Sequence, residues 1–217
     1  MEEARPDLYV SADIETDGPI PGEYSMLSFA FSLASRFDGS TFEAFEPGWE
    51  TTFYVELKPI SERFEQEALD VNRLDREALA VSGRVPEDAM REAADWIASH
   101  ANGARPVLVL YPLSFDWSFL HWYFIRFTGE SPFGHSSCLD IRTLYLARAL
   151  TTFDRSSQQS MPPSLLPTRP HTHHASDDAQ EQAELFNRVF AWALRGGGSD
   201  GPSTVPEEGL EPPTRGL

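Results

Sequence analysis

The stretch that decides how this chain folds is LYVSADIETDG at residues 8–18. Its apolar and small residues are typical of a strand covered on both faces in the middle of a sheet. Side chains two apart in a strand point to the same face, so Asp13 and Glu15 project together while Ile14 points the other way. Two like charges at the edge of a core are unfavourable unless a cation compensates them, and Mg²⁺ or Mn²⁺ favours carboxylate oxygens. The stretch therefore indicates a cation site that needs further ligands, although an acidic strand end before a turn at 17–19 is the plainer alternative.

Composition restricts the class of protein. At 217 residues with 41% hydrophobic residues, the chain suits one globular domain. No apolar run is long enough to span a membrane, and the acidic N-terminus has no signal-peptide pattern, so we expect a cytoplasmic protein. The single cysteine, Cys138, excludes an internal disulfide. A formal net charge of −17 argues against a long duplex held in a basic groove, but not against an enzyme that holds a short chain end through cations.

Hydrophobic periodicity predicts an α/β sandwich with a mixed sheet. After the first strand, strands are expected at 25–33, 51–57, 106–111 and 137–141, with the first three as antiparallel neighbours. Helices are expected at 65–79 (two short ones), 86–101, 115–128, 142–150 and 176–195. Loops are expected at 38–50 and, at greater length, at 151–172. The expected domain covers 7–195, between a flexible N-terminus at 1–6 and a disordered Gly/Pro/Glu-rich tail at 196–217.

Two further segments offer ligands. Asp116 lies just past the apolar strand at 106–111, in the first turn of a helix. His171, His173 and His174 come immediately before a helix headed by Asp177 and Asp178. Each segment alone has an ordinary explanation, since acids in a first helical turn stabilise the helix dipole and exposed histidines are often only solvated.

Taken together and in this order, the three segments resemble the motifs of the DEDDh family of 3′→5′ exonucleases, in the ribonuclease H-like superfamily. Asp13-Ile14-Glu15 followed by Thr16-Asp17-Gly18 looks like the first motif, residues 114–120 resemble the second, and residues 173–179 match the third at the His-to-Asp separation of five. The resemblance covers roughly residues 7 to 195. It implies a ribonuclease H-like mixed five-stranded sheet with helices on both faces.

The chain departs from the family pattern at two places. The second motif often carries Asn a few residues before Phe-Asp, where this chain has Tyr111-Pro112-Leu113-Ser114. Position 174 is a second histidine, which leaves two candidates for the base. Spacing to Asp178 favours His173, and His171 is expected to be a bystander.

The resemblance implies metal-dependent hydrolysis from a free 3′ end, releasing nucleoside 5′-monophosphates. Two Mg²⁺ or Mn²⁺ ions would activate water and stabilise the leaving oxygen, and a histidine has the pKa expected of a base near neutral pH. The implied metal ligands are Asp13, Glu15, Asp116 and Asp178, with His173 as the general base. Thr16, Met26 and Leu27 are the expected substrate contacts.

Alternatives concern the substrate and whether the domain is active. The expected substrate is single-stranded or short RNA or DNA, with RNA slightly ahead because basic patches are lacking. A catalytically idle domain that binds nucleic acid or protein is the second hypothesis, although the complete acid and histidine set argues against it. A metal-dependent phosphatase is less favoured, because the sequence has no Gly-x-Ser-x-Gly, Walker or His-Glu-x-x-His motif. A homodimer is compatible with the family, but no patch demands one.

Overall fold

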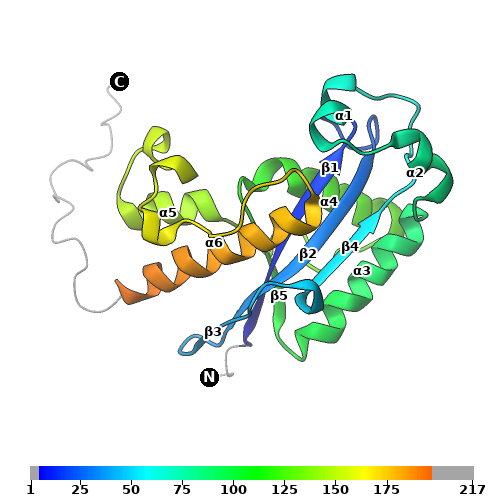
Figure 1. The fold of residues 1–217 in the computed structure, drawn as a ribbon. Coiled ribbons are helices and arrows are strands. Elements are labelled where there is room, and N and C mark those ends of the chain that lie inside the picture. The colour runs from blue at the N-terminus through cyan, green and yellow to red at the C-terminus, as the bar shows by residue number, and fades with distance from the viewer. Residues whose placement is uncertain (1–4, 197–217) are drawn as a thin grey trace, which may run out of the picture.

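A computed structural model describes residues 5–196 of the chain, and within them six strands form one mixed sheet (Figure 1). The strand order is β3-β2-β1-β5-β6, and β4 pairs with β2 on the same side as β3. β1 is antiparallel to β2 and parallel to β5. The predicted tail lies outside the described residues except for Gly196, as does most of the predicted flexible N-terminus. The strands are β1 (Asp7–Thr16), β2 (Met26–Phe37), β3 (Phe42–Ala44), β4 (Thr52–Glu56), β5 (Arg105–Leu110) and β6 (Cys138–Asp140).

Alternation along β1 gives the sheet two different faces. Leu8, Val10 and Ile14 belong to one apolar core, whereas Tyr9 belongs to a second core on the opposite face. Because successive side chains alternate, Asp13 and Glu15 share the face of Tyr9. This face is the one that the last helix covers.

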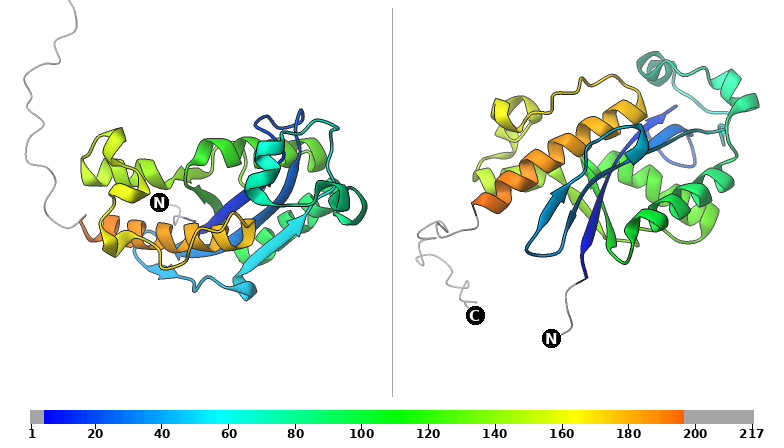
Figure 2. Two further views of the ribbon diagram at one scale, coloured as in Figure 1. Left: turned by 45° about the horizontal axis from the view of Figure 1, so that its top comes forward. Right: turned by 60° about the horizontal axis from the view of Figure 1, so that its bottom comes forward.

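Helices cover both faces of the sheet, as predicted (Figure 2). The long helix α6 (Ala175–Arg195) packs with α5 (Ile141–Ala149) on the face of Tyr9, and α3 (Pro86–Ala101) and α4 (Leu113–Thr128) cover the other. The buried residues of α6 include Ala183, Phe186 and Val189. Two short helices, α1 (Gln66–Asn72) and α2 (Arg76–Ser82), occupy the region where two were expected.

The sheet has one strand more than the five expected. The extra strand, β3, pairs with the far end of β2, which continues to Phe37 rather than ending near residue 33. Three residues are too few to give a periodicity signal, so β3 was hidden in the expected loop at 38–50. The long loop at 151–172 contains three single-turn 3-10 helices, at 153–155, 158–160 and 163–165.

The parallel pair β1 and β5 determines where polar groups collect. Their paired residues end at Ser11 and Val109, so the two strands separate just before Asp13. A bulge between β1 and β2 at Glu15/Thr16 follows, and bulges commonly re-aim side chains beside functional sites. The end of β1 therefore opens next to the start of α4, the helix that follows β5.

No helix in the described residues is both long enough and apolar enough to cross a membrane.

One buried hydroxyl joins α4 to the start of β2. The Tyr123 hydroxyl accepts a 2.7 Å hydrogen bond from the backbone N–H of Met26, and both residues are fully buried. We expect Tyr123→Phe to leave this donor unpaired and to destabilise the fold by about 1–3 kcal/mol. At about 2–4 °C per kcal/mol for a domain of this size, a thermal melt would detect the loss. An unchanged melting temperature would contradict the role assigned to this hydrogen bond.

Candidate active site

Three carboxylates from two ends of the chain meet at the end of β1. Single oxygen atoms of Asp13, Glu15 and Asp178 lie within 4.8 Å of one another. Asp13 and Glu15 come from the strand and are partly exposed, whereas Asp178, in the first turn of α6, is 1% exposed. The strand alternation and the helix start predicted from the sequence thus bring these acids together.

Asp116 supplies the fourth acid from the first turn of α4. Its side chain is 8% exposed and lines the same cavity as the other three. Burial raises the pKa of Asp116 to about 7, even though its own backbone N–H and that of Ile14 favour the charged form. The acid therefore occupies an electrostatically unfavourable position that the helix dipole alone does not explain.

Burial and mutual repulsion raise the pKa of both strand carboxylates. Burial, followed by the charges of Asp178 and Asp116, raises the pKa of Glu15 to about 8. Burial and then the charge of Asp116 raise the pKa of Asp13 well above its ordinary value. An all-oxygen donor set that repels itself in this way fits hard divalent cations such as Mg²⁺ or Mn²⁺, which would neutralise the charge.

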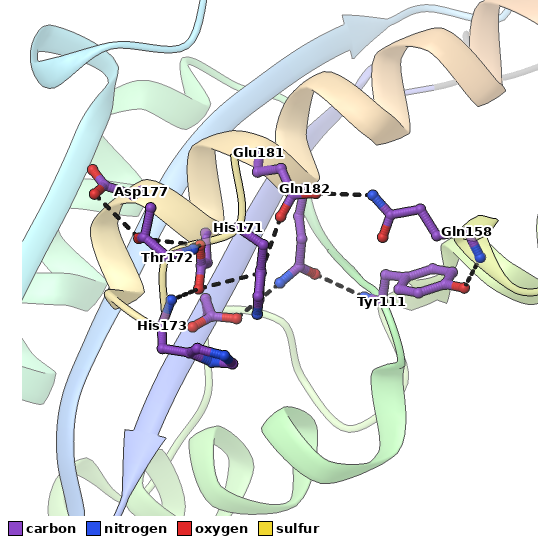
Figure 3. A network of polar contacts seen from close by, with 10 residues as sticks. Tyr111, Gln158, His171, Thr172, His173, Asp177, Glu181 and Gln182 are labelled. Atoms are coloured by element: carbon purple, nitrogen blue, oxygen red, sulfur yellow. Dashed lines mark hydrogen bonds and ion pairs between the residues drawn. The ribbon is translucent and has the colours of Figure 1, made fainter. Parts of the chain in front are cut away.

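The backbone before α6 holds Asp178 in place. Its two carboxylate oxygens accept hydrogen bonds from the N–H groups of Thr172 and His173, each at 2.8 Å (Figure 3). His173 adopts φ 58°, in the left-handed region that non-glycine residues seldom occupy. Such strain persists where the surroundings fix it, and here the bond to Asp178 is one of the constraints.

The three histidines have different environments. His173 is exposed and lines the cavity that contains the acids, and so does His171. His174 turns away: its ring packs on Tyr54, with ring centroids 4.9 Å apart. Position therefore distinguishes His173 from His174, as the spacing to Asp178 did. His171, expected from the sequence to be a bystander, also lies close to the acids, with its Nδ1 3.3 Å from an oxygen of Asp178.

A second set of polar side chains, which sequence reasoning missed, supports the acids (Figure 3). The Gln182 amide donates to Asp13 Oδ1 at 2.9 Å and accepts from the Tyr111 backbone N–H at 2.8 Å, which fixes the orientation of the amide. The Glu181 carboxylate accepts from Gln158 at 2.9 Å, and its other oxygen lies 3.1 Å from His171 Nδ1. Polar residues three and four positions after a helical ligand lie beside it, and this spacing was a usable signal.

This network also connects the site to the stretch at 111–114 and to the long loop at 151–172. Tyr111 stands in the stretch where the family often has Asn, and its hydroxyl accepts a hydrogen bond from the backbone N–H of Gln158. Gln158 lies in the long loop at 151–172. The loop therefore contributes one wall of the site instead of standing apart from it.

The expected substrate contacts occupy less accessible positions. Met26 and Leu27 are each 0% exposed, so in this structure their side chains cannot flank a base. Thr16 is 8% exposed, and its hydroxyl donates to the Gly18 carbonyl. Asp17, also in the first motif, is fully buried and pairs with Arg76 of α2 at 2.8 Å, which fixes the turn after β1.

The four acids, His171 and His173 border one cavity of about 500 Å³. It opens between the end of β1, the start of α4 and the segment before α6. Its lining comprises Asp13, Ile14, Glu15, Tyr111, Pro112, Phe115, Asp116, Gln158, His171, His173, Asp178, Glu181 and Gln182.

Comparison with known proteins gives one relative close in sequence. The chain is 37% identical over 184 residues to the 3′-5′ DNA exonuclease Cap18 of Escherichia coli, covering 84% of this chain and 91% of that protein. No family model matches the chain.

Several solved structures share the fold at low sequence identity. The nuclease domain of 3′hExo, described as a DEDDh family member bound to rAMP, superposes with a TM-score of 0.62 at 13% identity, covering 90% of this chain and 94% of that one. Pop2p of S. pombe, in a Mg²⁺- and Mn²⁺-bound form, gives 0.57 at 14% identity, with coverage of 87% and 84%. A 3′-exonuclease that recognises the histone mRNA stem-loop gives 0.63 at 15% identity; this chain is covered over 88% but spans only 64% of that chain.

The Escherichia coli relative is similar in sequence over most of both proteins, the sheet is ribonuclease H-like, and all three motifs meet at one site. These findings all indicate the same family. The chain therefore belongs to the DEDDh family of 3′→5′ exonucleases.

Proposed function

We propose that this exonuclease removes nucleotides from the free 3′ end of single-stranded or short DNA, using two divalent cations and His173 as general base. The observation that carries the proposal is the convergence of four acids and His173 on one cavity. Thr16 could contribute through its backbone, whereas Met26 and Leu27 have structural roles in this proposal.

We favour DNA over RNA as the substrate because of the relative from Escherichia coli. The 37% identical protein of Escherichia coli is named a DNA exonuclease. The chain's own composition had put RNA slightly ahead, on the lack of basic patches, and that preference stays a prediction. The net charge of −17 favours a short strand end over an extended duplex for either polymer.

Asp13, Glu15, Asp116 and Asp178 would hold the cations. When bound, two Mg²⁺ or Mn²⁺ ions would lower the pKa of the attacking water and stabilise the leaving 3′-oxygen. Gln182 would keep Asp13 in one orientation, since its amide is fixed by Tyr111. Neutralising the acids would also remove the repulsion that raises the pKa of Glu15.

His173 would accept the proton of the attacking water. An imidazole is suited to this role because its unperturbed pKa is near neutrality. The exposed ring at the cavity wall is accessible to water, and the hydrogen bond from its backbone N–H to Asp178 ties it to the acids.

The first prediction concerns the acids. Wild-type protein should shorten 3′-tailed oligonucleotides with Mg²⁺ or Mn²⁺ and stop in EDTA, and Asp13→Asn should abolish cleavage because it removes charge that balances the cations. Asp177→Asn, which changes an acid next to Asp178 without touching the four ligands, serves as the matched control. Product ladders from 5′-labelled DNA and RNA show the direction of degradation and which of the two polymers is preferred.

An inactive wild type that still binds oligonucleotides would favour the idle binding domain instead. A wild type that cleaves equally well in EDTA would contradict the metal requirement.

The second prediction separates the histidines. His173→Ala should slow turnover by roughly 10²–10⁴-fold, the usual cost of losing a general base, while Mn²⁺ binding measured by calorimetry persists. His174→Ala should retain far more activity, because that ring packs on Tyr54 and does not line the cavity. Wild-type turnover in His173→Ala would transfer the assignment to another group.

The third prediction concerns the stability of the metal-free protein. The pKa of Glu15 rises from 4.5 to about 8 in the fold, so the native state keeps a proton that the unfolded chain has lost between these values. Stability therefore falls as pH rises through this window. Thermal melts in EDTA should show a lower melting temperature at pH 8 than at pH 5.5, and Mn²⁺ should raise it most at pH 8.

Glu15→Gln is the control for that experiment, because it removes the titrating group while leaving the rest of the chain's charge in place. Its melting temperature in EDTA should change less with pH than that of the wild type. Identical pH profiles for the two proteins would contradict the effect assigned to Glu15.

A further inference from the structure

A cluster of two histidines and two acids lies beside the four carboxylates. Ligand atoms of His171, His173 and Asp178 are within 4.8 Å of one another. Glu181 lies next to this group, since its Oε2 is 3.1 Å from His171 Nδ1. Asp178 is the member that this cluster shares with the catalytic acids. Figure 3 shows His171 and His173 next to each other, below the start of α6 in that view.

The surrounding chain holds these groups in position. Asp178 is fixed by two backbone N–H groups, and Glu181, 5% exposed, is fixed by the Gln158 amide at 2.9 Å. The rings of His171 and His173 meet edge to face with centroids 4.6 Å apart. Both rings are exposed, so an ion can reach them from solvent. The site is thus open on one side and anchored on the other.

The donor set suits a different metal from the one that the four acids suit. Mg²⁺ selects oxygen ligands, whereas Zn²⁺ binds imidazole nitrogen and carboxylate oxygen in a tetrahedron. Ligand atoms at about 2.0–2.1 Å from a tetrahedral Zn²⁺ are roughly 3.4 Å apart. His171 Nδ1 lies 3.1 Å from Glu181 and 3.3 Å from Asp178, close to that spacing.

We propose that His171, His173, Asp178 and Glu181 form a Zn²⁺ site that inhibits the nuclease. A Zn²⁺ ion at this site would be coordinated by the ring nitrogen of His173, which would then be unable to take a proton from water. It would also be coordinated by an oxygen of Asp178, a proposed ligand of the catalytic cations. The argument for Zn²⁺ binding rests on the positions of these four side chains. Inhibition rests on the proposed function, in which His173 is the base.

The test compares full-length wild type with His171→Ala. His171 is neither a proposed Mg²⁺ ligand nor the proposed base, and its loss removes one zinc ligand. Because His171 contacts Asp178, the inhibition of each variant by Zn²⁺ is expressed relative to that variant's own Mg²⁺-dependent rate. His135→Ala, which changes another exposed histidine, is the matched control. Zn²⁺ affinity is measured on metal-free protein by competition with a chromophoric chelator, and inhibition is measured separately as the Zn²⁺ concentration that halves Mg²⁺-dependent cleavage of a 5′-labelled oligonucleotide.

His171→Ala should weaken both Zn²⁺ binding and Zn²⁺ inhibition by at least about tenfold, the smallest loss expected even for a residue that only supports a metal ligand. His135→Ala should match the wild type. Retained Mg²⁺-dependent activity shows that the variant is folded, and His171→Gln replaces it if the alanine variant is inactive.

Equal Zn²⁺ binding by wild type and the His171 variants would overturn the inference, because the acids at 13, 15 and 116 are present in all of them. Zn²⁺ binding that depends on His171 in a protein with no nuclease activity would instead leave the zinc site standing and refute the proposed function. Zn²⁺ binding that depends on His171 without any inhibition of an active enzyme would overturn the inhibitory role.

Discussion

Electrostatic repulsion among acids at the end of β1 is the constraint on which the rest of the site depends. Asp13 and Glu15 share a face of the strand, and Asp116 and Asp178 are added from the first turns of two helices. Burial and these neighbours raise the pKa of Glu15 to about 8. A fold gains nothing in stability from such an arrangement without cations, so the proposed role as ligands of divalent cations explains the acids best.

The sequence predicted those parts of the fold that rest on local pattern. Alternation at 8–15 placed two acids on one face, and the helix starts at Asp116 and Asp178 followed from apolar spacing and acidic first turns. The order of the three motifs then predicted convergence, since parallel strands such as β1 and β5 end at one edge. Short β3 escaped prediction because three residues carry no periodicity.

Contacts between distant segments could not be predicted in this way. The hydrogen bond from Gln182 to Asp13 spans 169 positions. The loop residue Gln158 donates its side-chain amide to Glu181 and its backbone N–H to the Tyr111 hydroxyl. The burial of Met26 depends on how α4 packs over the sheet, which no pattern at residues 26–27 reveals. The position of His171 likewise depends on the path of a loop without periodicity.

Crystals of the protein grown with Mn²⁺ would test the central claim most directly, through anomalous scattering at the manganese absorption edge. The account predicts anomalous peaks within coordination distance of Asp13, Glu15, Asp116 and Asp178, at the mouth of the cavity that His173 lines. Peaks confined to other parts of the surface, with these four carboxylates free of metal, would contradict it.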